Sequence, residues 1–301
     1  MGVFRMPVAQ VNNPQMKDIL DSEFQRSSDP SFLHRIAVSK YLNLPGIRGF
    51  WGPAVRFSTQ GGLLYATDMT GGGYHMVWTE SLPVFYSELG YLAWYLDGVS
   101  DYASSPDCLQ WDILASAAET WVGYKGIAAA AWICPTRVVP FAANEGILSK
   151  FLIAGNQRSW LMYRDNTIAN NLSVGISSDG ANLYLFDHTK TIQKDVWQFV
   201  AFTYNPAAVL GEAAGVRIWV NDTMEYHAAA DARGTAGFPA SIFNSTAEFQ
   251  AGCTNAATNP YQGYMTDWYL CGNYLLESEI FNVFETTKTV FGFANEKGSS
   301  W

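Results

Sequence analysis

The chain has 301 residues, of which 49% are hydrophobic and 15% aromatic, so it can bury a sizeable core and a globally disordered protein is excluded. Eighteen basic residues against 27 acidic ones give a formal net charge of −9. That balance disfavours a nucleic-acid groove or an anionic-membrane patch, because both need clustered lysine and arginine.

The first residues, MGVFRMPVAQ, contain no apolar run followed by a small-residue cleavage site, so we expect no signal peptide. No charge-free apolar stretch reaches the length of about 18 residues that a membrane span needs. Four cysteines are widely spaced, without a CxxC or a nearby histidine pattern. We therefore expect reduced thiols, as in a cytosol, and no zinc site.

Two helical patterns open the chain. Asn13-Pro14 and Asp29-Pro30 each supply an N-cap residue followed by proline at the first helical position. Apolar residues follow each signal at helical spacing, and Pro45-Gly46 ends the second pattern. The first stripe is Met16, Ile19, Leu20 and Phe24, and the second is Phe32, Leu33, Ile36 and Tyr41.

The pattern predicts a helical N-terminal arm over residues 1–46, which is too small to be stable alone. Its apolar stripes need a surface, either on the parent domain or on a neighbouring subunit. If the arm docks onto neighbours, the interface residues are Met16, Ile19, Leu20, Phe24, Phe32 and Ile36.

From residue 46 onward, short runs rich in β-branched and aromatic residues alternate with Gly, Asn, Asp and Pro, which is typical of strands and turns. The predicted strands are 49–57, 62–66, 75–79, 91–96, 126–134, 147–153, 159–164, 171–177, 181–187, 196–204, 215–220, 247–252 and 262–272. Many short strands without long helices between them predict an all-β protein, an antiparallel β-sandwich jelly roll.

Two hairpin turns are predicted, at Ser178-Asp179-Gly180 and at Asn221-Asp222. The small-residue-rich segments 205–214 and 228–245 are predicted to be long loops, which in a sandwich can carry recognition. Residues 275–290 are predicted to form one closing helix, with Ile280, Val283, Phe284 and Thr287 along one face.

An ordered series of segments resembles the laminin-G-like, concanavalin A-like lectin/glucanase superfamily. The segments are 96–102 (LDGVSDY), 126–135 (GIAAAAWICP), 147–150 with 155–160 (ILSK and GNQRSW), 197–204 with 216–222 (WQFVAFTY and VRIWVND), 261–269 (YQGYMTDWY) and 276–280 (LESEI). The resemblance implies a concanavalin A-like jelly roll over residues 47–292, after the arm at 1–46 and before a tail at 293–301.

The segment 45–51 (PGIRGFW) is similar to one that introduces this domain in proteins encoded by bacteriophage genomes. That resemblance implies a virion structural protein, such as a capsid decoration, fibre or tail component. Its partners would be virion proteins and other copies of itself in a homo-oligomer. It would be displayed on the virion surface after assembly in the host cytoplasm.

Two other hypotheses about the function stay open. The main alternative to a virion structural protein is a carbohydrate-binding lectin module, whose ligand would be a cell-surface or other glycan. A glycan-active hydrolase is less favoured, because the superfamily's catalytic strand carries Glu-x-Asp-x-x-Glu and no such run occurs here. No histidine lies in an HExxH or beside a nucleophile-elbow serine, so the sequence predicts no enzyme.

Candidate ligand-binding residues are aromatic and polar side chains in predicted loops and at the sandwich rim, where rings can stack on sugars. They are Tyr74, Trp78, Tyr163, Arg164, Asn255, Asn259 and Tyr261. The competing interpretation is that each is an ordinary rim residue. Asp68 and Asp267 could hold a structural calcium ion, since related folds clip early and late strands with one Asp from each. Asp68 could equally cap its own turn.

Overall fold

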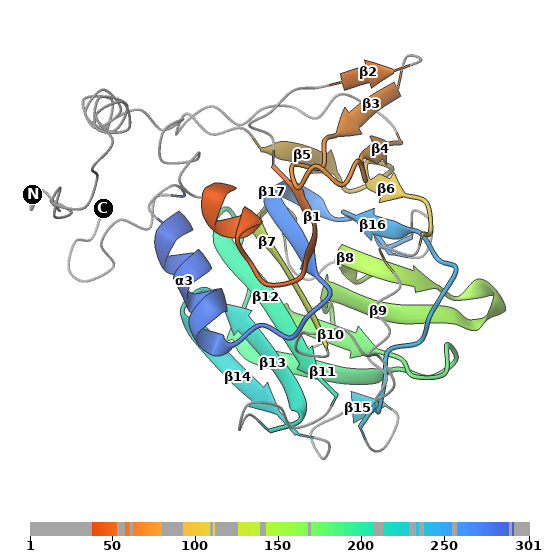
Figure 1. Cartoon of the computed structure of the whole chain (residues 1–301), viewed down its shortest axis with the longest axis vertical. Helices are drawn as coiled ribbons and strands as arrows, with labels where there is room; N and C mark the ends of the chain where they lie inside the picture. The colour runs from red at the N-terminus through yellow and green to blue at the C-terminus, as the bar shows by residue number, and fades with distance from the viewer. Residues whose placement is uncertain are drawn as a thin grey trace, which may run out of the picture.

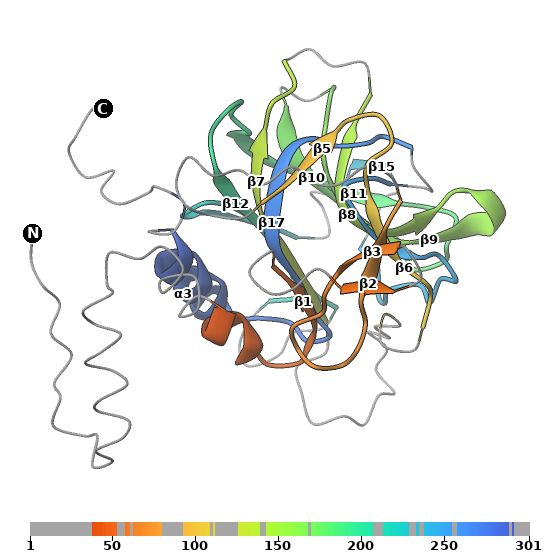
Figure 2. The same cartoon turned by 90° about the horizontal axis from the view of Figure 1, so that it is seen from above.

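The computed structural model describes residues 38–52, 58–60, 63–79, 93–108, 111, 126–138, 143–167, 170–206, 213–228, 233–234, 238–254, 258–288 and 291. Two antiparallel sheets lie face to face, and helices cover the outer side of the first sheet (Figures 1 and 2). The predicted antiparallel β-sandwich is confirmed.

The first sheet runs β1-β17-β7-β12-β13-β14, with β5 also paired to β17. Its strands are β1 (Ile47–Trp51), β5 (Trp94–Asp97), β7 (Ile127–Pro135), β12 (Gln198–Asn205), β13 (Gly215–Val220), β14 (Thr223–His227) and β17 (Gln262–Cys271). The second sheet runs β15-β11-β10-β9-β8-β16-β6-β4-β3-β2. Its strands are β2 (Ser58–Gln60), β3 (Leu63–Ala66), β4 (Met76–Trp78), β6 (Ala103–Ser105), β8 (Glu145–Leu152), β9 (Gln157–Arg164), β10 (Asn171–Ile176), β11 (Tyr184–Thr191), β15 (Arg233–Gly234) and β16 (Phe249–Ala251).

Every predicted strand overlaps an observed one, and both predicted hairpin turns connect neighbouring strands. Strands β2, β6, β14 and β15 were not predicted. The described helices are a helical segment at residues 38–42, the 3₁₀ turn η2 (Ala154–Asn156) and α3 (Glu277–Thr287). Among the described residues, no helix is long and apolar enough to cross a membrane. No disulfide joins the four cysteines.

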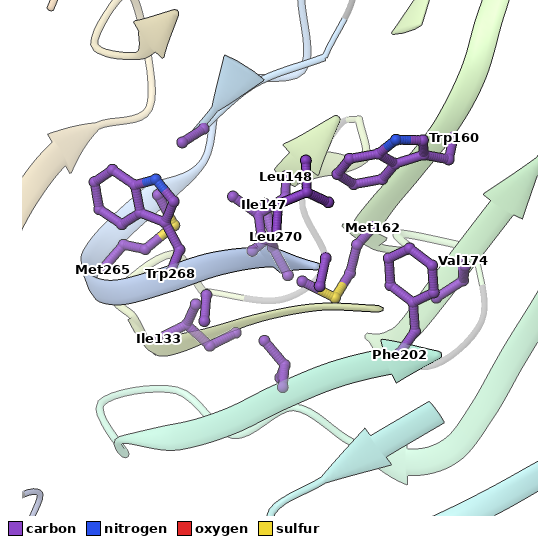
Figure 3. Packing of buried hydrophobic residues seen from close by; sticks show 14 of the residues in the cluster. Ile133, Ile147, Leu148, Trp160, Met162, Val174, Phe202, Met265, Trp268 and Leu270 are labelled. Atoms are coloured by element: carbon purple, nitrogen blue, oxygen red, sulfur yellow. The ribbon is translucent and has the colours of Figure 1, made fainter. Parts of the chain in front are cut away.

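The central strand β7 shows how the layers are built. Ile127, Ala129, Ala131 and Ile133 enter the core between the sheets, whereas Ala128, Ala130 and Trp132 enter a second core on the opposite face. Side chains alternate across a strand, so a fully buried strand feeds two cores at once. Figure 3 shows the core between the sheets, where large side chains from both sheets interdigitate.

The second core lies under the helical layer. Ile280, Val283, Phe284 and Thr287 of α3 are buried, which confirms the predicted closing helix with slightly shorter bounds. Tyr41 is fully buried and stacks on Phe50 with ring centroids 4.4 Å apart. The last turn predicted for the arm therefore packs on its own sandwich. The interface residues Met16, Ile19, Leu20, Phe24, Phe32 and Ile36 lie outside the described residues.

A buried ionic network joins the two sheets at one end. Arg164 of β9 contacts the Glu145 carboxylate of β8, and both side chains are fully buried. Arg137, which follows β7, places its Nε 3.0 Å from the other Glu145 oxygen. The backbone N–H of Gln262 in β17 also donates to that oxygen, at 3.2 Å. Burial raises the pKa of the Glu145 carboxyl, although both guanidiniums oppose that shift.

Candidate functional site

Three neighbouring strands of the second sheet place polar side chains in one row. The register sets Tyr163 of β9 opposite Ser173 of β10, and Ser173 opposite Asp187 of β11. Their neighbours Met162, Val174 and Phe186 point into the core between the sheets. Because successive side chains alternate across a strand, the row lies on the outer face of the second sheet.

Arg233 of β15 holds the end of this row. Its Nε donates to Asp187 Oδ2 at 2.9 Å, and its Nη2 donates to Asp187 Oδ1 at 3.0 Å. The same Nη2 donates to Asp165 Oδ2 at 2.7 Å. Ser173 Oγ donates to Asp187 Oδ1 at 2.6 Å. One guanidinium thus binds two carboxylates, Asp187 through a two-pronged contact that fixes its orientation and Asp165 through a single hydrogen bond.

These contacts determine the charge states in the row. Burial alone would raise the pKa of Asp165, but hydrogen bonds from Thr167 and Arg233 outweigh it and hold that pKa below the ordinary value. Burial, together with the nearby Asp165 charge, raises the pKa of Tyr163, so its phenol stays neutral. Hydrogen bonds to Asp187 contribute most to raising the pKa of Arg233. Asp165 is therefore ionised and Arg233 is charged at neutral pH.

An apolar patch adjoins the row. Leu161, Leu183 and Leu185 pack beside Tyr163 and Phe151 in a cluster separate from the main cores. Gly175 lies opposite both Leu161 and Leu185 in the register. A Cβ on Gly175 would lie 2.5 Å from Leu161 Cδ2 and 3.1 Å from Leu185 Cδ2. The missing side chain lets the leucines meet over the middle strand.

Accessibility differs along this surface. The Arg233 side chain is 42% exposed and the Asp187 side chain 18%, and Leu183 and Leu185 are half-buried. Tyr163, Leu161 and Asp165 are buried. We call Tyr163, Asp165, Ser173, Asp187 and Arg233, with the adjoining Leu183 and Leu185, the outer-face site. It combines hydrogen-bonding groups of fixed orientation with an apolar surface, a combination that suits polyhydroxyl ligands.

The sequence had predicted other ligand-binding residues to be exposed, and for several this was wrong. Trp78, Arg164 and Tyr261 are buried, because Trp78 packs in the core and Arg164 belongs to the ionic network beside Tyr261. Tyr163 is also buried, so it forms a wall of the outer-face site and offers no stacking surface.

The remaining predicted ligand-binding residues do not gather with Tyr163. Tyr74 is half-buried and its ring contacts Trp111 edge-on, at 5.2 Å between centroids. Asn259 is half-buried in a loop, where its side-chain amide donates to Thr254 Oγ1 at 3.2 Å. Asn255 lies outside the described residues. A binding role for these three residues stays a prediction.

The proposed calcium ligands both approach the end of β1. Asp68 accepts hydrogen bonds from the backbone N–H groups of Phe50, Thr70 and Tyr74, and from the Thr70 hydroxyl. Asp267 is buried at a bulge of β17, and a Cβ on Gly52 would lie 2.7 Å from its Oδ1.

The Asp68 contacts match the turn-capping interpretation better than a calcium site, since N–H and O–H donors already occupy both of its oxygens. Within the described residues, no group of three or more His, Cys, Asp or Glu side chains could hold a metal ion. The capping contacts of Asp68 do not favour the calcium site that the sequence suggested. A calcium ion held by Asp68, Asp267, backbone carbonyls and waters stays a prediction.

Sequence reasoning missed Asp165, Ser173, Asp187 and Arg233. Arg233 does lie in the segment 228–245, which was predicted to be a loop able to carry recognition. Ser173 and Asp187 lie within predicted strands, where only the register between strands shows that they face each other. The spacing within one strand could have placed Tyr163 and Arg164 on opposite faces.

Known structures share this fold. The binding domain of Paraclostridial Mosquitocidal Protein 1 has a TM-score of 0.55 and 12% identity, over 79% of this chain and 52% of that one. The ligand-binding domain of botulinum neurotoxin serotype D, in complex with N-acetylneuraminic acid, has a TM-score of 0.53 and 11% identity, over 83% and 52% of the two chains. The receptor-binding domain of botulinum neurotoxin type G has a TM-score of 0.51 and 12% identity, over 80% and 51%.

The chain thus spans about half the length of these structures. At such low identity the likeness shows the fold alone, a lectin-like β-sandwich. No protein-family model matches the chain, and no curated protein matches it. The laminin-G-like and bacteriophage resemblances accordingly stay predictions.

Proposed function

We propose that this chain is a non-enzymatic glycan-binding module and that the outer-face site contacts the glycan. The observation that carries the proposal is the row of Tyr163, Ser173 and Asp187, closed by Arg233 beside half-buried leucines. Sugar hydroxyls both donate and accept hydrogen bonds, and sugar C–H faces pack on apolar side chains. A carboxylate and a guanidinium in fixed orientation next to an apolar patch meet both needs.

The similar structures support this function. They are binding domains. That of serotype D is in complex with N-acetylneuraminic acid, and cell entry of type C depends on interaction with two ganglioside molecules. The binding domain of type DC is in complex with a protein, rat synaptotagmin II. Glycan binding is therefore the function that these similarities favour for this chain.

The charge state of Asp165 does not suit the acid role of a glycosidase. Asp165 and Asp187 both accept a hydrogen bond from the same guanidinium nitrogen. A glycosidase needs one carboxylic acid whose pKa is raised, so that it can protonate the leaving group. The pKa of Asp165 is lowered, so this residue is not such an acid.

A glycan array probed with the purified chain tests the proposal. We expect binding to a defined set of glycans that Arg233→Ala weakens at least about tenfold, because that change releases both carboxylates. Lys194→Ala is the matched control, since its side chain is also 42% exposed and also pairs with an aspartate, Asp195. Absence of glycan binding by a folded wild-type chain would refute the proposal.

We also propose, as a second role, that the N-terminal arm docks this module onto a larger assembly. This role covers the virion partners, the homo-oligomer and the virion-surface location that the sequence suggested. The structure sharpens its test, because Tyr41 and Leu44 are buried in the core under α3. Deleting residues 1–46 would damage the fold, so the informative variant lacks residues 1–37.

That truncated chain should keep the wild-type unfolding temperature and glycan binding but lose oligomerisation, measured by light scattering after size-exclusion chromatography. A wild-type chain that is monomeric, or a truncated chain that still assembles, would contradict the docking role.

A further inference from the structure

The charges around Arg233 bear on which glycans the outer-face site accepts. We infer that the site selects neutral glycans and rejects those that end in a carboxylate sugar such as N-acetylneuraminic acid. This inference rests on the proposed glycan-binding function and goes beyond it by naming the ligand class.

The local charge at Arg233 disfavours an anionic ligand. Asp165 and Asp187 both contact Arg233, so the three groups together carry a net negative charge at neutral pH. Asp165 is buried and its pKa is lowered, so it does not become neutral by taking up a proton near pH 7. A ligand carboxylate next to Arg233 would therefore face two carboxylates already in contact with the same guanidinium. Like charges placed together at an interface weaken binding strongly.

The geometry of the Arg233 guanidinium also disfavours a ligand carboxylate. Arginine binds a carboxylate best through two parallel N–H bonds from one edge. The Nε/Nη2 edge of Arg233 already makes that two-pronged contact with Asp187, and Nη2 also donates to Asp165. Among the described residues, Nη1 of Arg233 has no acceptor. The position that remains fits one hydroxyl oxygen and cannot supply a second two-pronged contact without breaking the first.

A neutral sugar can bind at the same groups without a negative charge. One hydroxyl oxygen can accept from Arg233 Nη1, while a neighbouring hydroxyl donates to the Asp187 carboxylate, whose side chain is 18% exposed. Leu183 and Leu185 lie beside these groups and are half-buried, so a C–H face of the ring can cover them. Neither contact requires a negative group on the ligand.

The experiment compares neutral glycans with the same glycans capped by N-acetylneuraminic acid, by titration of the full chain at pH 7 in low salt. Lactose and sialyllactose are the first pair, and the neutral glycans bound on an array, each with its sialylated counterpart, extend the set. We expect the sialylated member of each pair to bind at least about tenfold more weakly. Added salt should narrow that difference, because salt screens the repulsion.

Asp187→Asn tests the cause of the selectivity. Removing one negative charge should improve the affinity for sialylated relative to neutral glycans by about tenfold. Asp222→Asn is the matched control, because Asp222 lies in the β13–β14 turn of the other sheet and its side chain is 66% exposed. It should leave the affinity ratio unchanged.

The outcomes separate the two proposals. Equal or tighter binding of sialylated glycans that depends on Arg233 would overturn the selectivity and leave the glycan-binding function intact. Neutral-glycan binding that survives both Arg233→Ala and Asp187→Asn would place the ligand elsewhere. It would overturn the inference and the assignment of the outer-face site, and leave glycan binding by the chain intact. Absence of binding to every glycan would overturn the proposed function itself.

Discussion

Replacing Glu145 by glutamine removes the carboxylate that the Arg164 guanidinium contacts between the sheets. Both side chains are fully buried, so Arg164 would keep its charge with no solvent to stabilise it. Removing one partner of a buried ion pair costs about 3–5 kcal/mol. We expect the upper part of that range, because the same carboxylate also accepts from the Gln262 backbone N–H and contacts Arg137.

Removing both charges of the pair at once makes the test specific. Replacing both Glu145 and Arg164 by methionine removes the charges together, and well-packed apolar replacements of a buried pair are often neutral or stabilising. The double variant should therefore be more stable than Glu145→Gln. Arg137→Met is the matched single change. It should cost less than Arg164→Met, because Glu145 keeps its contact with the fully buried Arg164 and the lost Arg137 side chain is 23% exposed.

Urea unfolding followed by tryptophan fluorescence measures these differences at pH 7. A loss below about 1 kcal/mol for Glu145→Gln would refute the assignment of this pair as a buried, mutually dependent contact. The same assignment would be refuted if the double methionine variant were no more stable than Glu145→Gln or Arg164→Met.

Three further predictions concern the packing around Gly175, the buried His188 of β11 and the candidate calcium site. Gly175→Val should destabilise the chain by about 1–3 kcal/mol in the same urea assay, because its first side-chain atom would overlap Leu161, and an unchanged midpoint would contradict the packing. Burial lowers the pKa of His188 below 6.5 despite the opposing effect of Glu225, so its stabilisation is present above pH 6.5 and is lost as the pH falls through the folded-state pKa. Urea midpoints should accordingly drop with acidification below pH 6.5 in the wild type and less in His188→Gln. The unfolding temperatures measured in calcium and in EGTA should agree within about 1 °C. A rise of several degrees in calcium would instead support a metal site near Asp68.

The strand positions could be predicted because their sequences show the required pattern. The apolar segment 126–134 matches β7, and the alternating segment 196–204 matches β12. Strand β14 was missed because its sequence, TMEYH, is mostly polar and its residues are half-buried or exposed. Strand β15 has only two residues, which leaves no periodicity to detect.

The outer-face site was less predictable, because it depends on pairing between strands that are separate in the sequence. Tyr163 could be picked as a candidate by residue type alone. Its connection to Asp187 appears only when β10 lies between β9 and β11 in the observed register. A shift of one residue in that register would have turned Asp187 towards the core and Phe186 outward.

The helical layer under which Tyr41 lies has a consequence for how the molecule can be attached. Val38 and Phe291, the first and last described residues, both pack in the core between α3 and the first sheet. The outer-face site occupies the opposite side of the sandwich (Figures 1 and 2). A tether joined at either residue would hold the sandwich by its helical side and leave Arg233 pointing away from the anchor. In that orientation, many copies fixed to one support would all present the same face to a glycan-coated surface. Their combined avidity would then exceed the affinity of any single site.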